Sequence, residues 1–288
     1  MAAIARLAPA KINLFLHVGP LEADGYHPLA SLVVFADVGD RLTVEPAERL
    51  SLTVTGPFAG ALEGEGDNLV LRAVRALGAA AGIGEPGLRI TLDKQLPVAA
   101  GLGGGSSDAG AALKLARNAL GLPLDDAALA EIAAGIGADG PMCLHARAAW
   151  AEGRGDVLTF EDGLPALPAL LVNPGVPSST GGVYRAFDEG VAGRADRPAS
   201  PSARDAAAVI DWLSEQRNDL QAPAVALAPA IGEALATTAG LPGARLTRMS
   251  GSGATVFALF DTAAAAEAAG RSLAALQPDW WVRPTTLR

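Results

Sequence analysis

The stretch Pro97-Val-Ala-Ala-Gly-Leu-Gly-Gly-Gly-Ser-Ser-Asp108 is the most informative part of the chain. The stretch contains four glycines: Gly101, Gly103, Gly104 and Gly105. Because glycine has no Cβ, the backbone N–H groups here can point into one concavity and approach a ligand closely. Ser106 and Ser107 then open an expected helix, whose unpaired first-turn N–H groups favour an anion. The stretch predicts a phosphate-binding loop, and the simpler alternative is a flexible glycine-rich turn with a serine cap.

Spacing excludes the common phosphate loops. A Walker-type GxxxxGK[ST] loop requires a lysine after its glycines, and none follows here. The dinucleotide fingerprint GxGxxG requires a third glycine where Ser106 stands, and Gly251-Ser-Gly253 fails in the same way at Val256. The glycine loop of protein kinases needs that same third glycine, and the chain has no HRD or DFG triplet.

Composition indicates a folded protein with an acidic surface. Half of the 288 residues are hydrophobic, which is enough for a packed core, and only 18% are charged. The net charge of −9, from 22 basic and 31 acidic residues, argues against a nucleic-acid partner. A small phosphorylated ligand remains possible, because amides and one lysine can bind it.

Cysteine and histidine usage excludes several kinds of site. A single cysteine, Cys143, rules out internal disulfides and cysteine-rich metal centres. The three histidines show no metal-ligand spacing, so no metal-binding set of side chains is predicted, and His17 and His145 are expected to be structural. No apolar run approaches the ~20 residues of a membrane span, and no secretory signal is visible. We therefore expect a cytoplasmic protein that is not associated with membranes.

Hydrophobic periodicity and turn residues predict a mixed fold of two domains. Strands and helices follow one another without regular βαβ alternation, which favours the α+β class. The polar, Gly- and Pro-containing segment 161–168 suggests a boundary, giving domains 1–161 and 162–288. Expected strands cover 12–18, 32–35, 41–44, 50–55, 88–92, 148–152, 157–160, 169–172, 245–249, 255–260 and 281–283. Expected helices cover 69–81, 106–120, 125–136, the surroundings of 183, 205–214, 224–239 and 262–276.

Three further clusters carry polar residues at a distance from the loop. They are Pro9-Ala-Lys-Ile-Asn13, Gly137-Ala-Asp-Gly-Pro141 and Ser250-Gly-Ser-Gly253. Each has an ordinary structural interpretation: Lys11 as an exposed charge at a strand edge, Asp139 as a turn residue, and the last cluster as a plain hairpin turn. Only their joint occurrence in this order favours a functional interpretation.

With these clusters in place, the sequence resembles the GHMP family of small-molecule kinases. The family has an N-terminal lysine strand, a Pro-x-x-x-Gly-Leu-Gly/Ala-Gly-Gly-Ser-Ser loop and a C-terminal glycine-rich turn. The matching stretches run from residue 8 to residue 253 in the family's order. They are 8–16, Asp24-Gly-Tyr-His27, the loop to Asp108, Gly137-Ala-Asp139, Arg217-Asn-Asp-Leu220 and Met249-Ser-Gly-Ser-Gly253.

The resemblance implies an architecture and a reaction. The architecture is a ribosomal-protein-S5-like α/β domain followed by a ferredoxin-like α+β domain, with the active site in the cleft between them. The reaction is phosphoryl transfer from ATP, with Mg²⁺, to the 2-hydroxyl of cytidyl-linked methylerythritol on the way to isoprenoid precursors. A monomer or weak homodimer is expected. The alternatives are another GHMP kinase, such as a mevalonate or homoserine kinase, and a catalytically silent nucleotide-binding regulator.

The resemblance also implies residue roles. Lys11 and Asp139 would be catalytic, the carboxylate orienting the substrate hydroxyl and the ammonium lying beside the transferred group. Asn13 would place the polyol, and a cytosine would be held by Tyr26 and His27 with Tyr184 on its other face. For Tyr26 and His27, the ordinary alternative is a hairpin turn after Asp-Gly. ATP would contact Pro97, Gly101, Leu102, Gly103, Gly104, Gly105, Ser106 and Ser107, a serine hydroxyl approaching Mg²⁺, and Asn68 would contact adenine.

Two glycines depart from the family pattern. Gly140 stands where a bulky aliphatic residue is usual and is expected to loosen its turn. Gly110 lies inside the helix after the loop, where it should cost up to ~1 kcal/mol of helix stability relative to alanine. Asn218 and Asp219 are interpreted as a cap for the helix that follows them.

Overall fold

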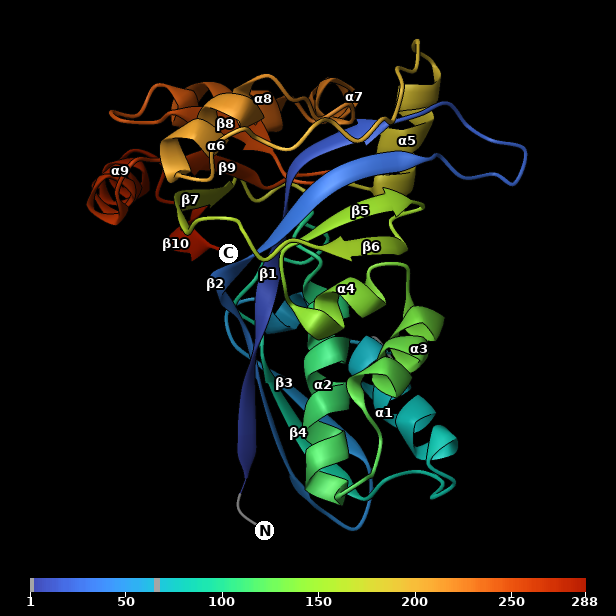
Figure 1. Cartoon of the computed structure of the whole chain (residues 1–288). Coiled ribbons are helices and arrows are strands. Elements are labelled where there is room, and N and C mark those ends of the chain that lie inside the picture. Colours follow the sequence, from blue (N-terminus) through green and yellow to red (C-terminus); the bar gives the residue numbers. More distant parts are fainter. Residues whose placement is uncertain (1–2, 65–67) are drawn as a thin grey trace. The chain divides into compact units, whose positions relative to one another are not determined.

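The computed structural model describes residues 3–64 and 68–288 (Figure 1). The sequence offers Asp67 and Asn68 as a cap for the helix expected at 69–81, and Asp67 lies outside the described residues. Contacts group the chain into two compact units. Unit 1 comprises Met1–Ala10, Val38–Val98 and Gly103–Ala146, and unit 2 comprises Lys11–Asp37, Ala99–Leu102 and Arg147–Arg288. The units interleave along the chain and do not coincide with the ranges 1–161 and 162–288, because β1 (Ile4–Val18) and β2 (Leu29–Pro46) each supply residues to both.

Unit 1 is a small sheet covered by helices. The second half of β2 pairs antiparallel with β4 (Leu88–Asp93), and β3 (Ser51–Thr55) pairs parallel with β4. The parallel pair is connected through α1 (Leu69–Ala80), and the helices lie together on one side of the strands (Figure 1). The remaining helical elements of the unit are η1 (Ala59–Leu62), α2 (Gly104–Leu120), α3 (Asp126–Ile136) and α4 (Gly140–His145).

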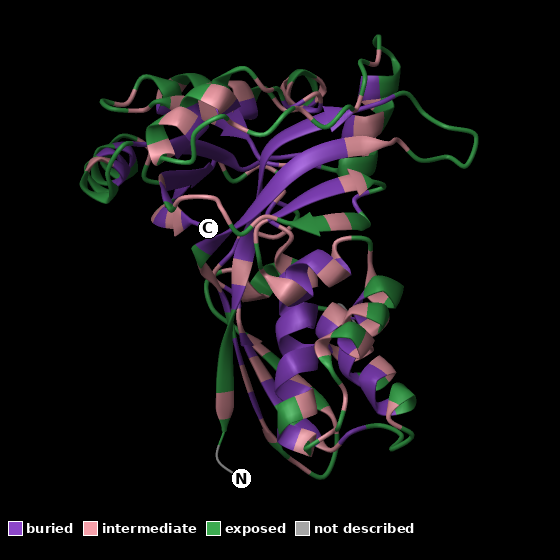
Figure 2. Cartoon of the chain, viewed as in Figure 1, coloured by how far each residue is buried: buried purple, intermediate pink, exposed green. Residues whose placement is uncertain are grey.

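The core of unit 1 forms around α2. This helix packs against α1, α3 and α4, and it is buried along most of its length (Figure 2). Alanines such as Ala112 and Ala116 are fully buried, and this small side chain lets the helices approach closely. The Ala- and Gly-rich composition of the helix therefore reflects its central position.

Unit 2 is built on antiparallel strand pairs. Strand β10 (Trp281–Leu287) pairs with β2 and with β7 (Leu167–Asn173), β7 pairs with β9 (Val256–Leu259), and β9 pairs with β8 (Leu246–Met249). Strand β5 (Ala149–Gly153) also pairs with β2, β6 (Val157–Phe160) pairs with β5, and β1 pairs with β2. The helices of the unit are α5 (Thr180–Asp188), α6 (Ala206–Ser214), α7 (Gln221–Leu227), α8 (Pro229–Ala239) and α9 (Ala263–Leu276). Helix α9 packs against β10 and β7, while α8 packs against β8 and β9, so two apolar clusters form on this sheet.

Strand pairs that are mostly antiparallel, with helices packed on them, confirm the α+β class. Side-chain caps fix several helix starts: Asn68, Asp125, Ser179, Asp205 and Thr262 each accept a hydrogen bond from a first-turn N–H. Gly121, with φ +62°, ends α2 as expected from sequence. Within the described ranges, no helix combines the length and apolar character that a membrane crossing requires.

Candidate active site

Three stretches that are distant in sequence meet in unit 2. The backbone N–H of Lys11 on β1 donates to the carbonyl of Leu102 at 2.8 Å. The N–H of Asn13 donates to Ser250 Oγ at 3.1 Å, and that hydroxyl donates to the carbonyl of Gly101 at 3.1 Å. The lysine strand, the first part of the glycine loop and the C-terminal glycine turn therefore form one hydrogen-bonded assembly.

The close contact between loop and turn requires glycine at position 101. Gly101 has φ +74°, a conformation that L-residues rarely adopt. A Cβ at this position would lie 2.4 Å from the carbonyl oxygen of Ser250, well inside van der Waals contact. Packing against the turn thus accounts for the glycine at this position.

The side chains of Lys11 and Asn13 are buried on β1. Lys11 is 7% exposed and Asn13 is 6% exposed, so the alternative of Lys11 as an exposed strand-edge charge is wrong. The Asn13 amide donates to Ser31 Oγ at 2.8 Å, and Ser31 in turn donates to the carbonyl of Phe15 at 2.6 Å. This chain of hydrogen bonds fixes the orientation of the Asn13 amide.

The prediction that Asn218 and Asp219 cap the next helix is wrong. Helix α7 begins at Gln221, and its N-cap position, Leu220, has no side-chain cap. Asn218 instead donates from Nδ2 to the carbonyls of Met249 and Gly251, both at 2.8 Å. It therefore supports the glycine turn, while Asp219 Oδ2 accepts from the N–H of Val18 on β1 at 2.8 Å.

The second part of the glycine loop belongs to unit 1, where it opens α2. The helix begins at Gly104, two residues before the expected start, after Gly103 with φ +60°. Its first turn closes with a hydrogen bond from the Ser107 N–H to the Gly103 carbonyl at 2.9 Å. The N–H groups of residues 104–106 precede that bond, which is the arrangement that favours an anion.

Asn68 and Asp139 both stand at helix starts in unit 1. Asn68 Oδ1 accepts from the Val70 N–H at 2.9 Å, so a contact with adenine would use its amide nitrogen. Asp139 occupies the N-cap position of α4, and its carbonyl accepts from the Cys143 N–H at 2.9 Å. Its side chain makes no cap hydrogen bond, so the carboxylate is not committed to closing the helix.

Gly140 lets α4 pack closely against α3, whereas the sequence predicted a looser turn at this residue. A Cβ at this position would lie 2.1 Å from the Ala133 carbonyl oxygen of α3. Gly110 makes an equivalent close approach, because its Cβ would lie 2.9 Å from the backbone of Leu144 in α4. Both glycines allow α4, and with it the backbone of Asp139, to pack closely within unit 1.

The predicted cytosine-binding residues lie in unit 2. Tyr26 follows a turn at Asp24-Gly25 as the hairpin interpretation expects, is 54% exposed, and has the Arg154 guanidinium 4.2 Å from its ring centre. His27 contacts Tyr184 with ring centres 5.1 Å apart, which leaves no room for a base between those two rings. His27 Nδ1 lies 2.9 Å from the Gly19 carbonyl, and Nε2 lies 3.3 Å from Asp188.

Unit 1 contains a buried ion cluster that no pattern in the sequence indicated. Lys94 Nζ donates to Asp40 Oδ2 at 2.5 Å and to Asp108 Oδ2 at 2.8 Å, and all three residues are at most 3% exposed. Burial raises the pKa of Asp108 to about 7, although the Lys94 ammonium opposes this shift. Burial would lower the pKa of Lys94, but the two carboxylates outweigh it and raise it.

Arg248, directly before the glycine turn, is a second buried charge that the sequence did not reveal. Its guanidinium donates to the carbonyls of Leu14 at 2.8 Å, Leu213 at 2.9 Å and Gln216 at 2.6 Å. Burial lowers its pKa to about 10. The side chain ties β1, beside Asn13, to the strand that carries the turn.

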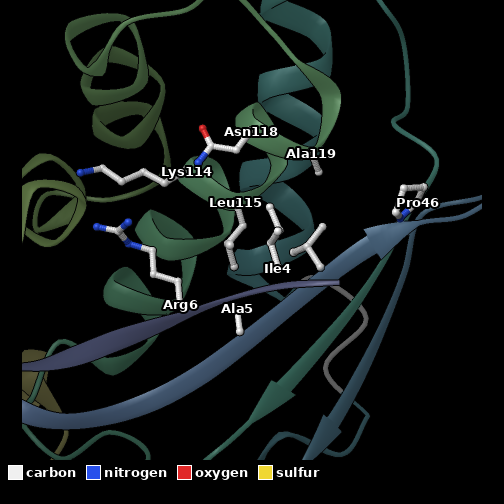
Figure 3. A pocket seen from close by; sticks show the side chains of 9 residues that line it. Ile4, Ala5, Arg6, Pro46, Lys114, Leu115, Asn118 and Ala119 are labelled. Carbon is white, nitrogen blue, oxygen red and sulfur yellow. The ribbon is translucent and has the colours of Figure 1, made fainter. Parts of the chain in front are cut away.

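A pocket of about 240 Å³ lies elsewhere in unit 1 (Figure 3). Ile4 and Leu115 are among its apolar walls, and the Arg6 and Lys114 side chains extend in the same direction at one side of it. None of the predicted site residues lines this pocket. Lys114 Nζ lies 3.3 Å from Asp126 Oδ2, so this lysine belongs to a salt bridge on the second half of α2.

Comparison with known proteins identifies the family. The family model "GHMP kinases N terminal domain" matches residues 68–147, and the model "GHMP kinases C terminal" matches residues 199–279. The chain belongs to the GHMP kinase family. The matched regions include the whole glycine loop, Asp139 and the C-terminal glycine turn.

Within the family, the chain is similar to one kind of kinase over its full length. It is 53% identical to the 4-diphosphocytidyl-2-C-methyl-D-erythritol kinase of Caulobacter vibrioides (strain NA1000 / CB15N), covering 97% of this chain and 98% of the relative. It is 51% identical to the protein of the same name from Methylobacterium radiotolerans, with complete coverage of both chains.

Solved structures agree with this similarity. A crystal structure of 4-(cytidine 5'-diphospho)-2C-methyl-D-erythritol kinase aligns with a TM-score of 0.79 and 35% identity over 99% of both chains. The homoserine kinase of Cytophaga hutchinsonii aligns with a TM-score of 0.67 at 19% identity, over 99% of this chain and 96% of that one, and shows the shared fold alone.

Proposed function

We propose that the protein transfers the γ-phosphoryl group of ATP to the 2-hydroxyl of 4-diphosphocytidyl-2-C-methyl-D-erythritol, in the non-mevalonate route to isoprenoid precursors. The observation that carries this proposal is the identity of about half the residues, along the whole chain, with kinases of that name. In the reaction, the substrate oxygen forms a bond to the γ-phosphorus, the bond to the β,γ-bridging oxygen breaks, ADP leaves, and the hydroxyl proton is released.

The proposed catalytic roles follow from what phosphoryl transfer requires. Such transfer depends on in-line positioning and neutralisation of charge more than on covalent catalysis. Lys11, buried on β1, would neutralise charge on the transferred group, and Asn13 would place the polyol. Asp139, at the start of α4, would orient the substrate hydroxyl and accept its proton.

The proposed nucleotide contacts use the backbone more than the side chains. The N–H groups at the start of α2 would bind ATP phosphates, together with the loop glycines, and Asn68 would contact adenine. Mg²⁺ usually keeps several waters and binds through phosphates and one or two protein oxygens. The buried Ser107 hydroxyl, which has no hydrogen-bond partner among the described residues, is a suitable protein oxygen, and the ion would neutralise triphosphate charge when bound.

The cytidine end of the substrate is proposed to bind at Tyr26, His27 and Tyr184. A pyrimidine would stack on an aromatic ring, and His27 would bind its edge. The contact between His27 and Asp188 would have to be exchanged for the base, because it occupies the ring nitrogen Nε2. The substrates of mevalonate and homoserine kinases contain no cytosine, so those enzymes do not need this aromatic group. The group therefore favours the cytidyl substrate over these two alternatives.

An ATP-consumption assay with three candidate alcohols tests the proposed substrate directly. Turnover should be observed with 4-diphosphocytidyl-2-C-methyl-D-erythritol, and not with mevalonate or homoserine. If the enzyme instead phosphorylated mevalonate or homoserine preferentially, the proposed substrate would be wrong and the protein would be a mevalonate or homoserine kinase. Binding of ATP with no turnover of any of the three would favour the catalytically silent regulator.

The Asp139→Asn variant tests the proposed catalytic carboxylate. We expect kcat to fall by about 10³-fold or more, because the amide cannot accept the hydroxyl proton. The dissociation constant of ATP should stay within about threefold of wild type, since the carboxylate is not proposed to bind the nucleotide. Unchanged turnover would remove Asp139 from the mechanism.

The Tyr26→Ala variant tests the proposed cytidine site. Loss of one stacked ring should raise the substrate KM by roughly tenfold and leave the ATP KM nearly unchanged. Equal effects on both constants would contradict the assignment of Tyr26 to the cytidine.

We further propose that the protein is cytoplasmic, is a monomer or weak homodimer, and has no nucleic-acid partner. Sedimentation of the purified protein would test the oligomeric state.

A further inference from the structure

The buried ions Asp40, Lys94 and Asp108 touch the glycine loop at both of its ends. Asp40 Oδ1 accepts from the backbone N–H groups of Gln95 and Leu96, at 2.6 and 2.8 Å, directly before the loop starts at Pro97. Asp108 lies in the second turn of α2, directly after the loop's serines. Lys94 Nζ joins the two carboxylates, at 2.5 and 2.8 Å.

The same ions lie against the backbone of the loop itself. A Cβ built on Gly104 would be 3.1 Å from Lys94 Nζ and 3.6 Å from Asp40 Oδ2. The ammonium therefore lies beneath the first residue of α2, where the unpaired N–H groups begin. A shift of this lysine would displace the residues that are proposed to bind phosphate.

The energetics of buried ion pairs indicate a specific role for this cluster. Replacing a buried ion pair by well-packed apolar residues is often neutral or stabilising, so stability alone does not explain three buried charges. Asp108 Oδ1 has no hydrogen-bond partner within the described part of the chain, which adds to the cost of burial. What the ions provide is geometry, because their hydrogen bonds join three elements: β2 through Asp40, the end of β4 through Lys94, and α2 through Asp108.

We propose that Asp40, Lys94 and Asp108 form a positioning clamp that holds both ends of the glycine loop in its nucleotide-binding arrangement. The clamp acts through the backbone of residues 95–96 and of α2, and none of its side chains needs to touch the nucleotide. This inference rests on the proposed binding of ATP at the loop.

Two matched lysine variants test the clamp. Lys94→Met removes the ammonium beneath the loop, whereas Lys114→Met removes a buried ammonium of α2 itself, ten residues and about 15 Å along the helix from Gly104. We expect the dissociation constant of ADP, measured by calorimetry, to rise by about tenfold or more in Lys94→Met. It should stay within about threefold of wild type in Lys114→Met, even where the melting temperature falls equally.

A second pair of variants keeps the test valid if Lys94→Met does not fold. Asp108→Ala removes the hydrogen bond between α2 and Lys94, and Asp108→Asn preserves an acceptor oxygen at the same place. We expect weakened ADP binding in the alanine variant and rescue in the asparagine variant. In both binding-deficient variants, the KM of the cytidyl substrate at saturating ATP should change by less than about threefold, since the clamp serves the nucleotide loop.

Three results would overturn the clamp. One is ADP binding in Lys94→Met or Asp108→Ala that is no weaker than in Lys114→Met. Another is the absence of rescue in Asp108→Asn, and the third is an equal rise in KM for both substrates. Wild-type protein that does not bind ADP would instead contradict the proposed function itself, and the clamp with it, so the two failures are distinguishable.

Discussion

His17 on β1 is a buried histidine whose protonation the fold opposes. Its Nδ1 lies 3.2 Å from the carbonyl oxygen of Asp196, so Nδ1 donates and Nε2 is the unprotonated nitrogen. Nε2 is buried and has no hydrogen-bond partner among the described residues. Burial lowers the pKa of His17 below its ordinary value of 6.5, because the charged imidazolium would lose its hydration.

A lowered pKa at His17 predicts loss of stability in acid. The unfolded chain binds this proton more readily than the folded chain, so the stabilisation present above pH 6.5 is lost as the pH falls below that value. The His17→Asn variant keeps a donor near the position of Nδ1 and does not titrate. Denaturation in urea at pH 7 and pH 5 should show a larger loss for wild type than for the variant, and equal losses would contradict this account.

Arg248 predicts a large loss of stability from a single substitution. In Arg248→Met, the carbonyls of Leu14, Leu213 and Gln216 lose the guanidinium as a donor, and we expect the free energy of unfolding to fall by about 3 kcal/mol. Arg245→Met is the control, because its ion pairs with Asp211 and Asp261 are near the surface and should contribute less than about 1 kcal/mol. Similar losses in the two variants, measured by urea denaturation, would show that the buried hydrogen bonds contribute little.

At the scale of elements, packing between α2 and α4 reverses a prediction made from helix propensity. Propensity alone favours alanine at Gly110 by up to ~1 kcal/mol. The structure leaves no space for its Cβ beside Leu144, so Gly110→Ala should destabilise the protein by about 1–3 kcal/mol through overpacking. Gly135→Ala in α3, where an added Cβ would meet no atom within 4 Å beyond the adjacent backbone of its own helix, should instead stabilise it by about 0.5–1 kcal/mol. Thermal unfolding of both variants checks the opposite signs, and a common sign would contradict the packing argument.

Elements with local signals could be predicted from the sequence. Helix α1 ends one residue from its expected bound, because Asn68 caps it and apolar residues recur at helical spacing. The strands expected at 32–35 and 41–44 are one strand, β2, because residues 36–40 continue it without an alternating pattern. Gly39 lies there against the Ala8 carbonyl, a contact that depends on a partner outside the local sequence.

The candidate site shows the same division between local and distant signals. The glycines and serines of the loop indicated an anion site because a helix start binds anions wherever it occurs. The hydrogen bonds from Asn13 to Ser250 and from Ser250 to Gly101 join residues as much as 237 positions apart. Lys94 likewise meets Asp40 across 54 positions, and an isolated lysine after a strand gives no sign that it is buried.

At the scale of the whole molecule, segments that are far apart in the sequence pack together in the same unit. Unit 2 joins residues 11–37, from the first part of the sequence, to residues 147–288. Phe35 on β2 exchanges two backbone hydrogen bonds with Arg288, at 2.8 and 2.9 Å. Leu16 on β1 pairs with the segment before α7, accepting from the Asp219 N–H and donating to the Arg217 carbonyl, both at 2.9 Å.

Division of the chain at residue 161 should therefore yield a C-terminal fragment that does not fold alone. The fragment 162–288 lacks residues 11–37, so Arg248 loses the Leu14 carbonyl, the Ser250 turn loses Asn13, and β10 loses its pairing with β2. Circular dichroism should show no cooperative thermal transition for this fragment. Co-expression of 1–161 with 162–288 is the control and should restore the transition, because every strand is then present. A cooperative transition in the isolated fragment would mean that β7–β10 and their helices suffice as a domain, and that the N-terminal strands only extend it.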